Sequence, residues 1–219
     1  MPVLKRAKQL PDWCELKHYE IIRLEAGDVW SVTLNGRGYK EKWICCEGAG
    51  IVSKEERQMP VFAGTALDFA AEEDAVAARI SVREGPFVLI RMFGQWGEEV
   101  GGCGVFRMEA SELPGNDGDP AEYPRNTFND NHYHDCDEYY IIYDGFGVVV
   151  TESRHYIVGA GDCVVTAAGD HHDIPIVVKP LKAVFFETTL IGRKRRGHLW
   201  NHTHGPATPD PAKRMHCLT

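Results

Sequence analysis

Hydrophobic and polar residues alternate along most of the chain, in short runs that are rich in β-branched and aromatic side chains. The clearest runs are 30–34, 139–143, 147–151 and 182–189, and each is bounded by glycine, proline, aspartate or asparagine. A period of two is typical of strands that bury one face, and the bounding residues favour turns. The pattern therefore predicts an all-β protein.

The chain repeats itself at a distance of 97 residues. Without a gap, 35–75 aligns with 132–172, and twelve positions are identical, where chance at ordinary composition would supply roughly two or three. Each copy has the order strand, glycine turn, strand, glycine turn, strand, which is typical of an antiparallel barrel or sandwich of hairpins. We therefore expect a duplication with four parts: a first barrel at 18–93, a connector at 94–124, a second barrel at 125–192 and a polar tail at 193–219.

Composition and charge narrow the classes of function. The chain of 219 residues carries a formal net charge of −8, which argues against a general nucleic-acid or anionic-membrane binder. No apolar run approaches the roughly 18 residues of a membrane helix, and the N-terminus lacks the apolar core of a secretory signal. Seven cysteines without CxxC spacing favour reduced thiols. We expect a cytoplasmic protein whose partner is a small molecule, with a homodimer as an option.

Four residues of the second copy have the spacing of a metal site. His132 and His134 lie two apart, so both leave the same face of a strand. Glu138 follows after a short turn-forming segment, and His172 comes after a glycine turn. Three imidazoles and one carboxylate suit a divalent first-row metal and leave positions open for water or substrate. The spacing predicts one ion, which could be Zn, Mn, Fe or Ni.

These residues resemble the two motifs of the cupin superfamily. The first, His-x-His-x3-Glu-x6-Gly, is matched at every spacing, and the second, Gly-x5-Pro-x-Gly-x2-His, is matched by Gly161, Gly169 and His172. Ala167 replaces the usual proline and Asn126 replaces a usual glycine, so turn geometry is in question more than metal binding. The resemblance implies two tandem cupin barrels of the jelly-roll type.

The first copy keeps Gly48 and Gly64 at the positions of Gly145 and Gly161 but loses the three histidine ligands. Asn35, Arg37 and Ala75 stand where the second copy has its three histidines, while Glu41 remains. We expect an ion pair between Arg37 and Glu41 in place of a metal. The chain is thus interpreted as a bicupin with a degenerate, metal-free N-terminal barrel.

Three functions are compatible with this site. A metal that holds carbonyl and hydroxyl oxygens of a sugar-like substrate would favour proton abstraction, as in cupin isomerases and epimerases. The same ligands suit an Fe(II) dioxygenase, and a non-catalytic metal or small-ligand binding module is a third reading. Tyr140 shares the inward face of Glu138 and is the best-placed catalytic candidate. Glu187 is the second candidate, although the direction of its strand is ambiguous.

Other polar residues have weaker claims. Arg125 could hold a carboxylate or phosphate, or form a surface ion pair. His171 should point away from the metal, as a residue behind the ligands or on the surface. The C-terminal tail reads as solvated, with docking onto a barrel or a subunit as the alternative; its histidines are His198, His202, His204 and His216.

Overall fold

A computed structural model describes residues 3–5, 10–34, 38–71, 76–110, 132–152, 154–190 and 209–214. These ranges are almost entirely β-strand, which confirms the predicted all-β class. The chain divides into two compact units, which are described separately. The N-terminal unit comprises Gln9–Trp96, and the C-terminal unit comprises Gly97–Thr219 together with Met1–Lys8.

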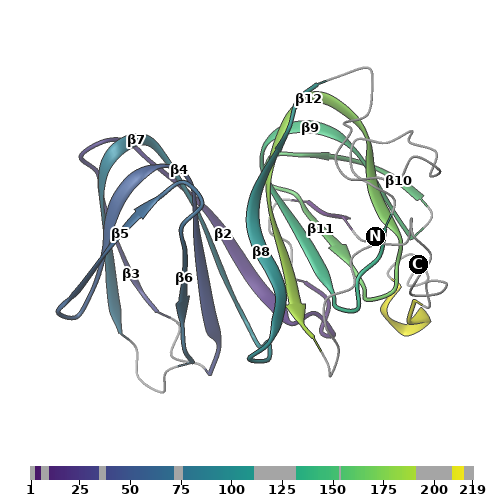
Figure 1. The fold of residues 1–219 in the computed structure, drawn as a ribbon, viewed down its shortest axis with the longest axis horizontal. Coiled ribbons are helices and arrows are strands. Elements are labelled where there is room, and N and C mark those ends of the chain that lie inside the picture. The colour runs from purple at the N-terminus through teal and green to yellow at the C-terminus, as the bar shows by residue number, and fades with distance from the viewer. Residues whose placement is uncertain are drawn as a thin grey trace. The chain divides into compact units, whose positions relative to one another are not determined.

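The N-terminal unit contains one six-stranded antiparallel sheet (Figure 1). The strand order is β2-β7-β4-β5, with β3 also paired to β7 and β6 also paired to β4. Alternating side chains of the long strands bury a core around Trp43, Ile80 and Phe87. The strands are β2 (Leu16–Leu24), β3 (Val29–Thr33), β4 (Lys40–Lys54), β5 (Arg57–Phe62), β6 (Ala66–Phe69) and β7 (Ala77–Gly94).

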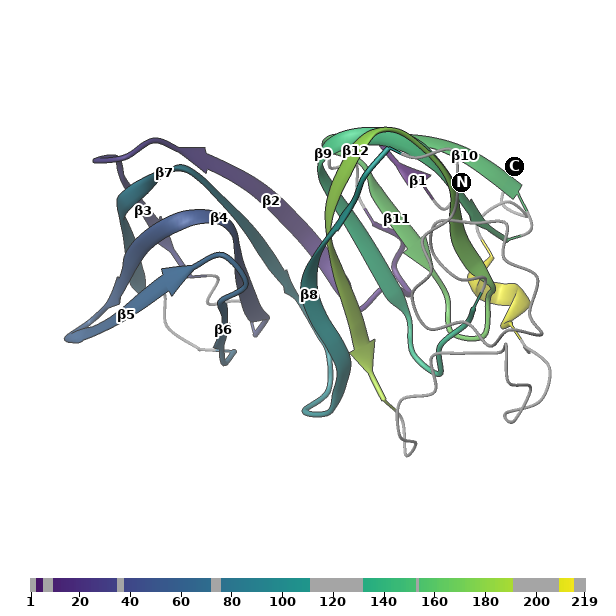
Figure 2. The same cartoon turned by 45° about the horizontal axis from the view of Figure 1, so that its top comes forward.

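The C-terminal unit contains a second six-stranded antiparallel sheet, with the order β1-β11-β9-β12-β8 and with β10 paired to β9. Figure 2 shows β9 and β12 as its long curved strands. Strand pairing closes neither sheet into a ring within the described residues. The elements are β1 (Val3–Leu4), β8 (Val100–Met108), β9 (Glu138–Thr151), β10 (Arg154–Gly159), β11 (Cys163–Thr166), β12 (His172–Thr189) and the short 3-10 helix η1 (Pro211–Lys213).

Two features of this sheet differ from the sequence interpretation. The connector expected at 94–124 contains β8, which pairs with β12 along most of its length. Val3 and Leu4, which no pattern singled out, pair with β11. The remaining domain boundaries stay a prediction.

The backbone repeats as the sequence does. Strands β10 and β11 begin and end 97 residues after β5 and β6. Glu55 and Glu152, 97 residues apart, have positive φ angles of 53° and 50°, which are uncommon for residues with a side chain. Gly145 in β9 has a φ of 88°, and a Cβ there would lie 2.0 Å from the Pro180 carbonyl oxygen, so only glycine lets β9 bend closely across β12. Gly48 has a similar φ of 77° in β4.

None of the six described cysteines forms a disulfide. Among the described residues, no helix is long and apolar enough to cross a membrane.

Candidate metal centre

The four predicted metal ligands meet in the interior of the C-terminal unit. His132 and His134 precede β9, Glu138 begins β9, and His172 begins β12. Their ligand atoms all lie within 4.8 Å of one another, and all four side chains are buried. The backbones of His132 and His172 are joined by two hydrogen bonds, with N···O distances of 3.2 and 2.9 Å. The fold thus assembles the whole predicted set.

Backbone hydrogen bonds join the two segments that carry the ligands. The Gly169 N–H donates to the His134 carbonyl at 2.9 Å, and the Ala168 N–H donates to the Asp137 carboxylate at 2.9 Å. A shift of one segment therefore moves the other, so the ligand positions depend on both.

The turn before His172 keeps its form without the usual proline. The Asp170 N–H donates to the carbonyl of Ala167 at 3.0 Å, which closes the turn. The Asp170 carbonyl lies 3.2 Å from Nδ1 of His172 and can accept a hydrogen bond from it. That contact orients the imidazole so that Nε2 faces the cluster.

Charges inside the cluster are strongly coupled. Oε2 of Glu138 lies 2.6 Å from Nε2 of His172 and 3.2 Å from Nε2 of His134. Burial alone would raise the pKa of Glu138, but the two imidazoles together hold it well below its usual range. Burial likewise acts to lower the pKa of His172, and the Glu138 carboxylate outweighs it, so that pKa is raised. The glutamate is therefore ionised and its surroundings favour a cation.

The donor atoms fit a divalent metal. Oε2 of Glu138 and Nε2 of His172 are buried, and among the described residues neither makes a hydrogen bond of good geometry. When Nδ1 of His172 donates to Asp170, its neutral imidazole presents a lone pair at Nε2. Two acceptors that approach each other to 2.6 Å in a buried site need either a shared proton or a cation that both of them bind. A set of three imidazoles and one carboxylate suits a first-row divalent ion.

Glu187 points into this site, which settles the direction that the sequence left open. It is the cross-strand partner of Glu138, it is 1% exposed, and its Oε1 lies 3.9 Å from Nε2 of His134. A Cβ on Gly101 would lie 2.5 Å from Oε2 of Glu187, so the glycine in β8 leaves room for the carboxylate. The site therefore holds a second acidic group beside the four clustered ligands.

Tyr140 lies where strand alternation predicts it. Its side chain belongs to the buried core of the C-terminal unit, and its ring packs edge-on against His172 with the centroids 5.7 Å apart. Phe106 from β8 packs on the same ring at 5.4 Å. The catalytic roles assigned to Tyr140 and Glu187 stay predictions.

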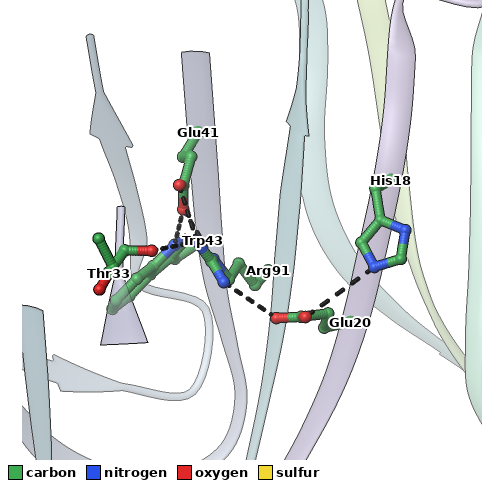
Figure 3. A network of polar contacts seen from close by, with 6 residues as sticks. All are labelled: His18, Glu20, Thr33, Glu41, Trp43 and Arg91. Carbon is green, nitrogen blue, oxygen red and sulfur yellow. Dashed lines mark hydrogen bonds and ion pairs between the residues drawn. The ribbon is translucent and has the colours of Figure 1, made fainter. Parts of the chain in front are cut away.

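The N-terminal unit has an ion-pair network around Glu41, the counterpart of Glu138 (Figure 3). Arg91 donates to both carboxylate oxygens of Glu41, at 2.7 and 2.8 Å. It also donates to Glu20 at 3.1 Å and to the Thr33 carbonyl at 3.0 Å. Nε1 of Trp43 donates to Glu41 at 3.0 Å. Burial acts to lower the pKa of Arg91, but the two glutamates raise it above its ordinary value.

This network contains a partner of Glu41 that the sequence did not predict, Arg91 from β7, the cross-strand neighbour of Trp43. The partner that the sequence predicted, Arg37, lies outside the described residues, as do Asn35 and Ala75. The ion pair between Arg37 and Glu41 therefore stays a prediction. Among the described residues, the guanidinium beside this carboxylate comes from a strand that is distant in the sequence.

Other candidates are only partly described. His171 is half-buried and packs against Tyr133 with the ring centroids 5.7 Å apart. Its pKa is lowered, mainly by burial and then by the neighbouring His172. Residues that lie outside the described ranges are Arg125, Asn126, His198, His202, His204 and His216.

The described part of the C-terminal tail, 209–214, docks onto the C-terminal unit. The sequence predicted a solvated tail, with docking as the alternative. Lys213 contacts the carboxylate of Asp137 through two hydrogen bonds of 3.0 Å, and Arg214 contacts that of Asp170 at 3.1 and 2.5 Å. Neither of these two ion pairs was predicted from the sequence. The available signal was the acidic residue beside Glu138 and the one two positions before His172, since buried carboxylates require cationic partners.

No family model matches the chain. An uncharacterized protein, y4oW, from Sinorhizobium fredii is 39% identical over 213 residues, which cover 97% of this chain and 96% of the relative.

Solved structures share the fold at low sequence identity. Vicilin from Corylus avellana is 9% identical over 90% of this chain and 88% of its own, with a TM-score of 0.58. Bacillus subtilis oxalate decarboxylase, which has Mn(II) centres, is 11% identical over 82% of this chain and 70% of its own, with a TM-score of 0.53. These likenesses concern the fold alone. The chain belongs to the family of protein y4oW and has a cupin-type fold.

Proposed function

We propose that the protein is a metal-dependent enzyme that acts by proton transfer on a small sugar-like or hydroxy-carbonyl substrate. The observation that carries the proposal is the buried cluster of His132, His134, Glu138 and His172 with the carboxylate of Glu187 beside it. A purely structural ion would not require a further buried acidic group at 3.9 Å from one of its ligands.

One divalent ion per chain, Zn, Mn, Fe or Ni, would be held by these four ligands. When bound, such an ion supplies Lewis acidity that polarises a carbonyl and makes the neighbouring C–H more acidic. The chain's own residues then have to remove the proton from the carbon next to the carbonyl and later return a proton to the substrate.

Glu187 is the proposed base. Its carboxylate is buried and adjacent to the cluster, where it could accept a proton from the carbon next to the polarised carbonyl. It would return the proton to the same carbon in an epimerisation, or to the carbonyl carbon in an isomerisation, in which the hydroxyl proton of the substrate passes to the former carbonyl oxygen. Tyr140 is the proposed second contact, because its phenol can donate to or accept from a substrate oxygen. Its edge-on packing against His172 and Phe106 would fix the ring during this step.

The architecture that we propose for this enzyme is a bicupin. The C-terminal unit is the metal-binding barrel and the N-terminal unit is a degenerate, metal-free barrel. Support comes from the 97-residue sequence repeat and from strands that recur at the same distance. The Arg91 contact with Glu41 supports the metal-free assignment, since the guanidinium already neutralises the carboxylate.

The test combines metal analysis with two assays. Protein purified without added metal is analysed for Zn, Mn, Fe and Ni, and the loaded protein is incubated with aldoses and ketoses in deuterium oxide. Metal-dependent incorporation of deuterium at carbon, lost in Glu187→Gln but with metal content unchanged, is the expected result. Oxygen consumption by the iron form with a catechol, flavonol or thiol would instead identify a dioxygenase.

A third result would favour a binding module. This is tight binding of a small ligand that requires His134, with neither exchange nor oxygen uptake.

A further inference from the structure

The C-terminal residues Lys213 and Arg214 contact the two segments that carry the metal ligands. We propose that they are positioning residues, which hold Asp137 and Asp170 so that the ligand cluster keeps its geometry. The inference rests on the proposed metal site and assigns a function to the end of the chain, beyond the site itself.

The contacts are made to buried carboxylates. Asp137 is 5% exposed and Asp170 is 2% exposed, whereas the side chains of Lys213 and Arg214 are 31% and 28% exposed. Arg214 donates from Nε and Nη2 to the two different oxygens of Asp170, which is the forked geometry that a guanidinium favours. The two partly exposed cations thus contact carboxylates that are buried more deeply in the unit.

Asp170 contacts both Arg214 and one of the proposed metal ligands, His172. Its carboxylate is held by Arg214, and its carbonyl oxygen is 3.2 Å from Nδ1 of His172. Because that carbonyl orients the imidazole, a rotation of the Asp170 peptide would turn Nε2 of His172 away from Glu138. Groups that orient metal ligands in this way usually affect metal affinity by 10- to 100-fold.

Asp137 belongs to the other ligand-bearing segment, the one that carries His132, His134 and Glu138. It immediately precedes Glu138, and its carboxylate accepts hydrogen bonds from both Lys213 and the Ala168 N–H. Its carbonyl accepts the N–H of Thr188 in β12 at 2.9 Å. Lys213 therefore neutralises the carboxylate that ties the segment before β9 to the turn before β12.

A matched control exists in the same unit. Lys5 donates to the carboxylate of Asp162 at 2.6 Å, and Asp162 is 5% exposed. The contact is also an exposed lysine on a buried aspartate, but Asp162 follows the glycine turn between β10 and β11 and is not among the clustered ligands. Lys5→Ala removes a comparable ion pair without touching the ligand-bearing segments.

The experiment measures the affinity of the full chain for Zn(II) by competition with a chelator. We expect Arg214→Ala and Lys213→Ala to bind Zn(II) about 10- to 100-fold more weakly than the wild type, whereas Lys5→Ala binds it within about threefold. The visible absorption spectrum of the Co(II)-loaded protein should change in Arg214→Ala but not in Lys5→Ala, because only the former alters ligand geometry.

Further variants keep the test decisive. Lys213→Arg should retain affinity, whereas Arg214→Lys should lose about tenfold, because one ammonium cannot hold both oxygens of Asp170. Arg214→Lys decides the matter if Arg214→Ala does not fold. In an Asp170→Asn background, Arg214→Ala should have little additional effect.

Two failures are distinguishable. Wild-type protein that binds no Zn(II) would overturn the proposed metal site and this inference with it. Wild-type binding together with unchanged affinity in Arg214→Lys and Lys213→Ala would overturn the inference alone.

Discussion

A buried glutamate lies at the start of a long strand in each unit, Glu41 in β4 and Glu138 in β9, but the groups around it differ. In the N-terminal unit, Glu41 is held by the guanidinium of Arg91, which donates to both of its oxygens. In the C-terminal unit, Glu138 faces imidazoles from His134 and His172 at 3.2 and 2.6 Å. Glu41 is therefore neutralised by a cation that belongs to the chain, whereas Glu138 and its neighbouring imidazoles form a site that can bind an ion.

The difference has a consequence for chemistry. A guanidinium remains charged and offers no position to a substrate, so the contact between Arg91 and Glu41 can only stabilise the fold. In the C-terminal unit, three imidazoles would supply lone pairs without charge and Glu138 one negative charge, and a five- or six-coordinate metal held by these four ligands keeps a position open. Under the proposed function, the reactive unit differs from the structural one because its three histidines hold an ion beside the glutamate, where the structural unit has a guanidinium.

The largest expected effect breaks the N-terminal side of the comparison. Arg91→Ala leaves the buried Glu41 without its cation, and the loss of one partner of a buried pair costs about 3–5 kcal/mol. Urea unfolding followed by circular dichroism measures this change. The double variant Glu41→Leu with Arg91→Met should recover most of the stability, because no buried charge remains. Equal stability of Arg91→Ala and the wild type would contradict the account.

Removal of the ion breaks the C-terminal side. An ion present at a thousand times its dissociation constant stabilises the folded state by about 4 kcal/mol. Chelation should therefore speed hydrogen exchange in β9 and β12, while β4 and β7 keep their protection. Equal loss of protection in both pairs of strands would show that the ion does not belong to the C-terminal unit.

Exchange of one hydroxyl sharpens the comparison further. Tyr140→Phe should lower turnover by roughly 10²-fold, the usual scale for a general acid or base, with metal content unchanged. The counterpart of Tyr140 in the repeat is Trp43, and Trp43→Phe should lower stability while the turnover of the folded protein is kept. Normal turnover in Tyr140→Phe would remove this residue from the mechanism and leave Glu187 as the candidate.

Acidification should weaken metal binding at the C-terminal cluster. Burial acts to raise the pKa of Glu138, but the neighbouring imidazoles outweigh burial and lower it, so the carboxylate stays ionised as the pH falls. The pKa of His172 is raised above 6.5, so its imidazole takes up a proton first and then cannot bind a metal. Metal affinity should be greatest at alkaline pH. As the pH is lowered, the affinity should already begin to decrease before pH 6.5 is reached, which chelator competition can measure. Equal retention at pH 5 and pH 8 would contradict an imidazole-rich site.

The smallest expected effect concerns the ligand positions that the first copy has lost. Asn35→Ala and Arg37→Ala should leave metal content unchanged, because the proposed ion is bound 97 residues further along the chain. Metal analysis of both variants, with His132→Ala as the control that loses the ion, checks this expectation. A drop in either variant would place a ligand in the N-terminal unit.

Local patterns predicted the fold class and the four clustered residues. Alternation identifies strands because each strand buries one face, and His132 and His134 share a face because they lie two apart. Glu187 could not be assigned by counting, since β12 has register shifts between Asp173 and Ala183 that change which face a residue occupies.

Long-range partners could not be predicted in the same way. Arg91 is 50 residues from Glu41, and Lys213 is 76 residues from Asp137. The spacing of the repeat suggested Arg37 as a cation for Glu41, but nothing local to Glu41 pointed to Arg91, which the pairing of β4 with β7 brings beside it. Such contacts depend on strand register, which is set by the packing of the whole unit.

Metal stoichiometry tests the central claim most directly. The full chain, purified without added metal and then loaded with Zn(II) and freed of excess, is analysed by mass spectrometry beside His134→Ala and Arg91→Lys. The account predicts one tightly bound ion per chain in the wild type and in Arg91→Lys, and almost none in His134→Ala. Two ions of equal affinity in the wild type, or one ion retained in His134→Ala, would contradict it.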